Sequence, residues 1–318
     1  MTQVESIGAD LGGTKLAVGV VDGVPETLWE EEVPSRGYSQ EKVVTLLAGQ
    51  INKAHEARPE ASSVGVGIPA TLDHETGRAI STVNLDLEDL PIGEMLRDEV
   101  KLPVAIDNDG NLAMLAEAMY GAARGSRYAL LLTIGTGIGG GIWAGGEIYR
   151  GASGAGAELG HFVVDIDGHP CQGNCPNRGC VESMASGTAI GRLGREAAES
   201  CPESLLGRQL AAGEEIDARV VHEAAKKGDR AALDAINVAG HYLGQALVSF
   251  ANVFQPEVIV LGGGAIAFGE LLIAPARREV EQFALKPMNG TPVVAAELGP
   301  AAGMIGAAVY GRMEAGVS

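Results

Sequence analysis

The sequence is poor in aromatic side chains and in positive charge. Phenylalanine, tryptophan and tyrosine make up 4% of its 318 residues, so a binding site built on aromatic stacking is not expected. Its 23 basic side chains stand against 41 acidic ones, which gives a net charge of −18. Because so acidic a surface repels phosphate backbones and anionic lipids, we expect no nucleic-acid partner and no membrane partner.

The sequence also lacks a convincing membrane or targeting segment. One uncharged stretch, residues 128–146, is nineteen residues long, but it contains seven glycines and two threonines. That composition is typical of two strands joined by a turn rather than of a membrane span. Residue 10 is already an aspartate, which leaves no room for the apolar stretch of a secretory signal. The sequence therefore predicts a cytoplasmic protein.

Glycine is what the sequence has in excess, with 46 residues, about twice the usual share. Three clusters of glycine lie next to predicted strands. Residues 12–13 and 135–141 each lie in the turn of a predicted strand pair, at 6–21 and 128–146. Residues 262–264 follow a single predicted strand at 258–261. Glycine turns let backbone N–H groups approach an anion without a Cβ in the way. Asp10, just before the first turn, could hold a hydrated Mg²⁺ ion beside a phosphate chain.

The second cluster formally matches the dinucleotide fingerprint G-x-G-x-x-G at residues 135–140. That fingerprint must open a helix, whereas residues 141–146 continue as a strand broken by glycines. No GK[ST] ending of a P-loop is present either. Three glycine turns therefore favour a nucleoside triphosphate held by two lobes, and a zinc-containing nicotinamide dehydrogenase remains the lesser alternative.

The strand, glycine turn and strand of residues 6–21 recur about 125 residues later, which predicts two similar α/β halves. A chain of 318 residues also exceeds the size at which one hydrophobic core stops growing. Hydrophobic spacing predicts helices and buried strands elsewhere. The predicted helices are 41–56, 110–122, 229–254 and 301–312, and the predicted strands are 64–68 and 104–106. Asp107 or Asp109 is positioned to cap the helix at 110–122.

The cysteines form a pattern typical of a metal site. Cys171, Cys175 and Cys180 give the spacing C-x3-C-x4-C, and His161 lies ten residues upstream. Three thiolates and an imidazole make a closed, tetrahedral and therefore structural zinc site. The alternative to a zinc site is three free thiols. A disulfide is not expected, because the cytoplasm keeps cysteines reduced. Cys201 is interpreted as an ordinary thiol.

Six motifs, taken in order, resemble the ROK family of sugar kinases, and above all its bacterial glucokinases. They are DLGGTK at 10–15, IDNDGN at 106–111, TIGTGIGGG at 133–141, GAELGH at 156–161, GCVES at 179–183 and LGGG at 261–264. The resemblance covers nearly the whole chain. It implies an α/β, two-lobed, actin-like or hexokinase-type (ribonuclease H-like) ATPase fold with a structural zinc loop. The small lobe would comprise residues 1–110, with a C-terminal helix at 303–318 packing back on it, and the large lobe 111–302.

The resemblance also implies the site residues. Asp109 matches the catalytic aspartate of the family. Without the resemblance, Asp109 could equally be an ordinary capping residue of the predicted helix at 110–122. The implied sugar ligands are Asn84, Asn108, Asp109, Glu158, His161 and Glu182. The implied nucleotide and phosphate ligands are Asp10, Gly12, Gly13, Thr14, Lys15, Thr136, Gly137, Gly263 and Gly264. The implied zinc ligands are His161, Cys171, Cys175 and Cys180, of which Cys171 departs by two residues from the family spacing C-x-C-x4-C.

The expected activity is transfer of the γ-phosphoryl group of Mg·ATP to the 6-hydroxyl of glucose, with Asp109 as general base. Fructose, mannose, allose, N-acetylglucosamine and N-acetylmannosamine remain alternative acceptors, and polyphosphate an alternative donor. A sugar-sensing repressor is less compatible, because only nine residues precede Asp10 and the chain is acidic. The family resemblance further implies a homodimer or homotetramer.

Overall fold

The computed structural model describes residues 4–23, 25–35, 37–73, 76–82 and 88–317. The chain divides into two units, each with its own contacts. Unit 1 consists of Met1–Arg127, Gly141–Ala157 and Glu297–Ser318, and unit 2 of Tyr128–Gly140 and Glu158–Ala296. The lobes expected from the sequence, with boundaries at 110/111 and 302/303, stay a prediction.

The first sheet contains the predicted N-terminal strand pair. Its order is β3-β2-β1-β4-β8, with β1 antiparallel to β2 and parallel to β4. Its strands are β1 (Ser6–Leu11), β2 (Lys15–Val21), β3 (Thr27–Pro34), β4 (Val64–Ile68) and β8 (Val104–Asn108). The strands predicted at 6–21, 64–68 and 104–106 are thus confirmed. A small sheet, with order β5-β6-β7, follows β4 in the chain and comprises β5 (Ala70–Asp73), β6 (Arg78–Thr82) and β7 (Glu88–Leu90).

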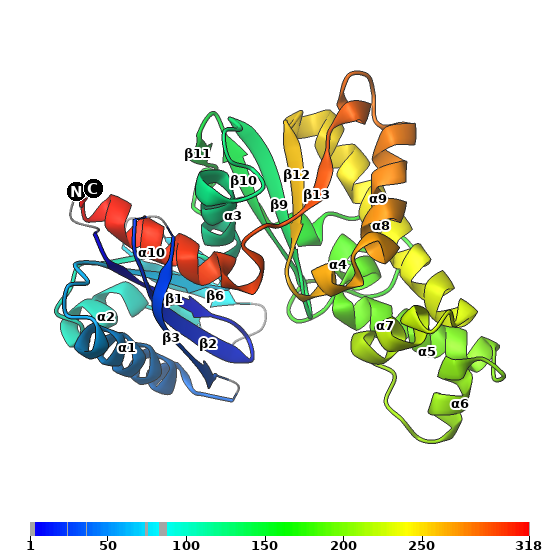
Figure 1. Ribbon diagram of the computed structural model, residues 1–318, viewed down its shortest axis with the longest axis horizontal. Helices are drawn as coiled ribbons and strands as arrows, with labels where there is room; N and C mark the ends of the chain where they lie inside the picture. Colours follow the sequence, from blue (N-terminus) through cyan, green and yellow to red (C-terminus); the bar gives the residue numbers. More distant parts are fainter. Residues whose placement is uncertain (1–3, 24, 36, 74–75, 83–87, 318) are drawn as a thin grey trace. The chain divides into compact units, whose positions relative to one another are not determined.

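The two faces of the first sheet are covered in different ways. Ile7 and Ala9 of β1 are fully buried in one hydrophobic core with α1 (Gln40–Ala57), the helix predicted at 41–56. Gly8, which points to the other face, meets α10 (Ala302–Glu314), drawn in red in Figure 1. A Cβ atom on Gly8 would lie 1.9 Å from the Met304 carbonyl oxygen. The small-residue helix predicted near the end of the chain therefore packs backbone against backbone on β1.

The second sheet repeats the topology of the first. Its order is β11-β10-β9-β12-β13, and β9 is parallel to β12. Its strands are β9 (Tyr128–Ile134), β10 (Ile138–Ala144), β11 (Glu147–Ile148), β12 (Val258–Gly262) and β13 (Val293–Ala295). In both sheets the strands, counted along the chain, lie in the order third, second, first, fourth, fifth. The repeat inferred from the two glycine turns is thus confirmed in the strand order.

Unit 2 is mainly helical beyond Cys180, as expected. Its helices are α4 (Val181–Ala185), α5 (Gly187–Ser200), α6 (Leu205–Ala211), α7 (Ala218–Lys226), α8 (Arg230–Phe254) and α9 (Glu270–Phe283). Helix α8 confirms the helix predicted at 229–254 and lies beside α9 (Figure 1). Within the described ranges, none of the helices combines the length and the apolar character that crossing a bilayer requires.

Two further helices, α2 (Ile92–Glu99) and α3 (Asp109–Tyr120), belong to unit 1. The cap predicted for α3 was wrong. Asn108 is the capping residue, because its extended backbone lets its side chain accept hydrogen bonds from the N–H groups of Gly110 and Asn111. Asp109 is instead the first helical residue, and Asp107 belongs to strand β8.

Candidate functional site

Two carboxylates of unit 1 lie close together. Asp10 is in β1, and Asp109 begins α3; a Cβ atom on Gly67 would lie 3.5 Å from both Asp10 Oδ1 and Asp109 Cα. Burial raises the pKa of Asp10 to about 7, and the negative charge of Asp109 adds to the increase, whereas Lys15 opposes it. A divalent cation would favour the ionised form of both carboxyls. This donor set therefore fits the Mg²⁺ ion expected next to Asp10.

The first glycine turn joins β1 to β2. The N–H of Gly12 donates to the Lys15 carbonyl over 2.8 Å, which closes the turn. Ser35 holds it from outside, since its hydroxyl donates to the Gly12 carbonyl (2.8 Å) and its N–H to the Thr14 carbonyl (3.1 Å). Gly13, Thr14 and Lys15 are exposed, and the Lys15 ammonium pairs with Glu32. The four residues predicted here form one accessible turn directly after Asp10.

The start of α3 rests on an ion pair that sequence reasoning missed. The fully buried Asp107 accepts hydrogen bonds at Oδ2 from Nε (2.9 Å) and Nη2 (2.7 Å) of Arg150. Its Oδ1 accepts from the Asn108 N–H and the Asn111 side chain. The Arg150 guanidinium also lies over the ring of Tyr310. Asp107 is visible in the motif IDND, but no local pattern identifies Arg150 as its partner.

The predicted sugar ligands of unit 1 are only partly described. Asn108 is half-buried, and its side-chain amide donates to the Ala70 carbonyl over 3.4 Å, besides its capping role. Asp109 is half-buried as well, and its Oδ1 accepts a hydrogen bond from the Gly110 N–H (2.9 Å). Asn84 lies outside the described residues. Asn108 and Asp109 are therefore adjacent at the junction of β8 and α3.

The second and third glycine turns come together in unit 2. Gly263 has φ +81° and would, with a Cβ atom, lie 2.5 Å from the carbonyl oxygen of Ile134, so only glycine fits. Its turn therefore lies against the start of the turn at 135–137. Because β9 and β12 are parallel, Thr136, Gly137 and the Gly263-Gly264 pair lie at the carboxyl ends of neighbouring strands. Ligands of open α/β sheets bind at such an edge.

The cysteine cluster is formed as the spacing predicted. The ligand atoms of His161, Cys171, Cys175 and Cys180 all lie within 4.8 Å of one another. Cys175 Sγ is 3.9 Å from Cys180 Sγ, and Cys171 Sγ is 3.5 Å from His161 Nδ1. Zinc–ligand bonds of about 2.0–2.3 Å in a tetrahedron give edges of this size. Cys171 thus joins the cluster despite its longer spacing, whereas the exposed Cys201 does not belong to it.

The chemistry of the cluster also fits zinc. Burial is the main reason why the pKa of the Cys171 thiol is raised, and the neighbouring thiols add to it. Burial likewise raises the pKa of Cys180. Without a cation these groups are held as thiols, whereas a bound zinc ion favours the thiolates and releases protons on binding.

Glu158 and Glu182 lie beside this cluster in unit 2, next to its members His161 and Cys171. His161 turns Nδ1 toward the cysteines, and its Nε2 lies 4.0 Å from Glu158 Oε2. Desolvation raises the pKa of Glu158, although 52% of its side chain is exposed; Glu182 adds to the increase, and His161 opposes it. Glu182 is 5% exposed, and its Oε2 accepts from the Ile138 N–H over 2.8 Å. The three predicted side chains are therefore neighbours.

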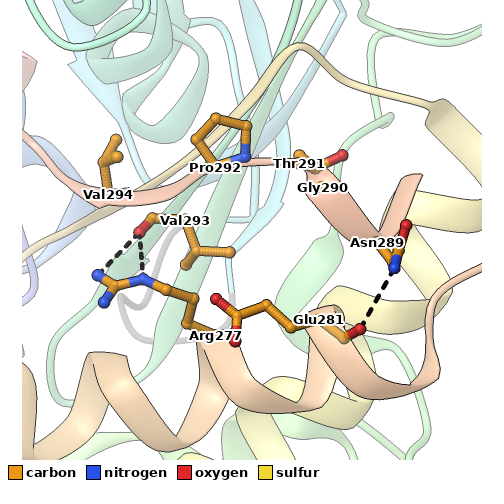
Figure 2. A pocket seen from close by; sticks show the side chains of 8 residues that line it. All are labelled: Arg277, Glu281, Asn289, Gly290, Thr291, Pro292, Val293 and Val294. Carbon is orange, nitrogen blue, oxygen red and sulfur yellow. Dashed lines mark hydrogen bonds between the residues drawn. The ribbon is translucent and has the colours of Figure 1, made fainter. Parts of the chain in front are cut away.

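A separate cavity of about 310 Å³ lies between α9 and the segment that leads into β13 (Figure 2). None of the residues predicted from the sequence lines it; its walls are Arg277, Glu281, Asn289 and 290–294. Arg277 donates to the Val293 carbonyl and pairs with Glu270, and Asn289 donates to the Glu281 carbonyl. Because this cavity contains none of the carboxylates, glycine turns or cysteines of the site described above, it is not the candidate site.

Comparisons with known proteins agree with one another in matching this chain to ROK family sugar kinases. The model of the ROK family matches residues 6–313. The glucokinase of Halalkalibacterium halodurans is 35% identical over 307 residues, covering 94% of this chain and 92% of the relative. The crystal structure of a ROK family glucokinase from Streptomyces griseus, in complex with glucose and AMPPNP, superposes with a TM-score of 0.87 at 33% identity, covering 97% of this chain and 99% of that one. The N-acetyl-D-glucosamine kinase of Haemophilus influenzae is 28% identical over 95% of this chain and 97% of its own length.

Proposed function

The chain belongs to the ROK family, and from this premise we propose that it is a glucokinase, which transfers the γ-phosphoryl group of ATP to the 6-hydroxyl of glucose. The observation that carries the proposal is the juxtaposition of Asp10 and Asp109 behind an exposed glycine turn. The similarity to a glucokinase whose structure holds glucose and an ATP analogue supports the choice of substrates.

Asp109 is the proposed proton acceptor. The 6-hydroxyl oxygen forms a bond to the γ-phosphorus while the bond from that phosphorus to the β,γ-bridging oxygen breaks, leaving ADP. The hydroxyl proton passes to a carboxylate oxygen of Asp109 and later to solvent. In such reactions the phosphoryl group has largely left its donor when the proton moves, so a weak base in the right position is sufficient. Asp10 would hold Mg²⁺, which neutralises charge on the phosphates when it is bound.

The sugar ligands that we propose are those implied by the family motifs: Asn84, Asn108, Asp109, Glu158, His161 and Glu182. Carboxylates can each accept two hydroxyl hydrogen bonds, which suits the neighbouring hydroxyls of a pyranose. His161 would contribute its Nε2–H, because its Nδ1 faces the cysteine cluster. A zinc ion there would fix the tautomer and the orientation of this ring.

The identity of the acceptor is the finer part of the proposal. The related N-acetyl-D-glucosamine kinase makes an N-acetylhexosamine the second candidate acceptor. Fructose, mannose, allose and N-acetylmannosamine as acceptors, and polyphosphate as donor, belong to the same test. The cytoplasmic location and the homodimer or homotetramer stay predictions from the sequence.

The test is ADP release from Mg·ATP with glucose, mannose, fructose, allose, N-acetylglucosamine and N-acetylmannosamine, using the Asp109→Asn protein as the blank. We expect turnover to be highest with glucose and to be lost in the variant. Turnover with another sugar alone would keep the kinase and change its substrate. If folded, metal-bound protein turns over none of these sugars, the proposed kinase activity is wrong and a sugar sensor is favoured.

A further inference from the structure

We propose that Gln172, the residue after the cluster ligand Cys171, is a positioning residue for the phosphoryl donor. Together with Glu182 it would hold the second glycine turn in the orientation that receives the phosphates. The inference rests on the proposed function, because it assigns a donor role to the turn at 135–137. It gives the cysteine loop, the segment from Cys171 to Cys180, a task in addition to supporting the sugar ligands.

The observation is a set of hydrogen bonds on both sides of Gly137. The carbonyl oxygen of Thr136 accepts from Gln172 Nε2 (3.4 Å) and from the Thr188 hydroxyl (2.8 Å). The N–H of Ile138 donates to Glu182 Oε2 over 2.8 Å. Gln172 follows Cys171, and Glu182 comes two residues after Cys180. Both ends of the cysteine loop therefore hold the same turn.

These contacts fix the two peptide planes that flank Gly137. A trans peptide is planar, so the Thr136 carbonyl and the Gly137 N–H point in opposite directions. Holding the Thr136 oxygen thus fixes the direction of the Gly137 N–H. Holding the Ile138 N–H fixes the next plane in the same way. Glycine on its own would let these planes rotate, because it lacks the steric restriction of a Cβ. The contacts therefore keep a backbone donor aimed in one direction.

The position of Gln172 follows from the length of the cysteine loop. The Cys175 N–H donates to the Gln172 carbonyl over 3.4 Å, and Gly173 between them has φ +57°. The C-x3-C segment is thus a turn that begins at Gln172. The amide of Gln172 also donates to the hydroxyl of Ser186 (3.2 Å), which is fully buried and caps α5. These contacts join the metal cluster, the glycine turn and the start of α5.

Gln172→Met is the first variant, because methionine keeps the length of the side chain and removes its donor. Its control is Gln209→Met on α6, where a half-buried glutamine of the same unit bonds to Glu214. Calorimetric titration of the metal-loaded proteins would give Kd for an unreactive ATP analogue with Mg²⁺ and, separately, for glucose. We expect the nucleotide Kd of Gln172→Met to rise about 3- to 10-fold, the usual range for one lost hydrogen bond. The glucose Kd and the zinc content should match those of the control.

A second measurement does not depend on any ligand. Hydrogen exchange, read by mass spectrometry over residues 133–140, should be about 3- to 10-fold faster in Gln172→Met than in Gln209→Met. Equal exchange in the two variants, or a glucose Kd that weakens as much as the nucleotide Kd, would overturn the inference. A different result would refute the proposed function: the wild-type protein binds no nucleotide, but hydrogen exchange still differs between Gln172→Met and Gln209→Met. In that case Gln172 holds the turn at 135–137, but the turn does not bind the phosphoryl donor. If Gln172→Met fails to fold, Thr188→Val is the second variant, because it removes the other hydrogen bond to the Thr136 carbonyl. Its control is Thr188→Ser, which keeps the hydroxyl, and the same two measurements apply.

Discussion

The two glycine turns occupy the same position in sheets of the same strand order, yet they are held in different ways. Each turn is closed by a backbone hydrogen bond of its own, from the Gly12 N–H to the Lys15 carbonyl after β1 and from the Gly135 N–H to the Gly137 carbonyl after β9. From outside, the turn after β1 is held by Ser35 and by the pair between Lys15 and Glu32. The turn after β9 is held by Gln172, Thr188 and Glu182, which come from the cysteine loop and from α4 and α5. One topology has thus been given two kinds of support.

The difference indicates which groups each half of the protein contributes. The first half is the one with the turn after β1, and the second half is the one with the turn after β9. The first turn follows Asp10, which lies near Asp109, so its half contains the charged groups that we propose to act on protons and cations. Around the second turn the charged group Glu182 is already bonded to the backbone. We infer that the first half supplies reactive groups and the second half supplies geometry. Each change predicted below affects one half at a time, and one pair of substitutions compares the two halves.

The largest effect is expected for Asp109→Asn, which removes the proposed proton acceptor of the first half. Loss of a positioned base lowers kcat by about 10²- to 10⁴-fold. The glucose Kd should change by less than about threefold, because asparagine keeps the size and one oxygen of the side chain. Steady-state ADP release and calorimetry measure the two quantities. Asp98→Asn, at an exposed position of α2, is the control, and a variant that keeps a tenth of the wild-type kcat would remove Asp109 from this role.

Removal of the zinc ion that the cysteine cluster is expected to hold is the next largest change, and it should affect only the second half. We expect a chelated protein that is still folded by circular dichroism to bind glucose at least about tenfold more weakly, since His161 and Glu182 lose their support. Hydrogen exchange should accelerate over residues 133–140 and stay constant over residues 11–16. Normal sugar affinity in a folded, zinc-free sample would contradict this prediction.

A pair of alanine substitutions compares the two turns directly. A Cβ atom at Gly137 would lie 2.3 Å from Glu182 Oε2, so Gly137→Ala must displace that carboxylate from the Ile138 N–H. We expect the free energy of unfolding to fall by about 1.5–3 kcal/mol, because a hydrogen bond to a charged group is lost. At Gly12 the nearest atom, the Lys15 carbonyl oxygen, would be 3.2 Å away, and Gly12→Ala should cost less than about 0.5 kcal/mol. Urea unfolding measures both, and equal costs would show that the two turns are supported alike.

The smallest effect concerns the pH dependence of the first half. Because the pKa of Asp10 is raised from 3.8 to about 7, the folded state binds this proton more tightly than the unfolded state. Its contribution to stability is therefore complete below about pH 4 and is lost as the pH rises toward 7. Without added Mg²⁺, Asp10→Asn should raise Tm by at least about 2 °C at pH 8 and by less at pH 5. A difference in Tm that does not change with pH would contradict the assignment.

The sequence predicted the features that depend on local patterns. Alternation and glycine punctuation located the strand pairs at 6–21 and 128–146, and cysteine spacing identified the four members of the metal cluster. These predictions succeeded because each rests on residues that are neighbours in the chain. The cap of α3 was assigned wrongly because the motif IDND offers three residues in succession, Asp107, Asn108 and Asp109, that can each cap a helix. Only the backbone conformation of Asn108 decides among them.

What the sequence could not give are pairings between distant segments. Arg150 and Asp107 are 43 residues apart, and Gln172 and Thr136 are 36 apart. Neither pair leaves a periodic trace, because an ordinary arginine and an ordinary glutamine become specific only through the fold. The raised pKa of Asp10 is of the same kind, since it depends on burial and on Asp109, nearly a hundred residues away.

The backbone contact between β1 and α10 has a consequence for how the protein is made. The ribosome must translate about 300 residues after β1 before α10 emerges, which at about 5–20 residues per second takes roughly 15–60 s. During that interval one face of the first sheet lacks the helix against which Gly8 and Gly65 pack. The N-terminal strands must therefore wait for nearly the whole chain to be synthesised, and chaperones that shield unfinished sheets have their longest opportunity to act on this half of the protein.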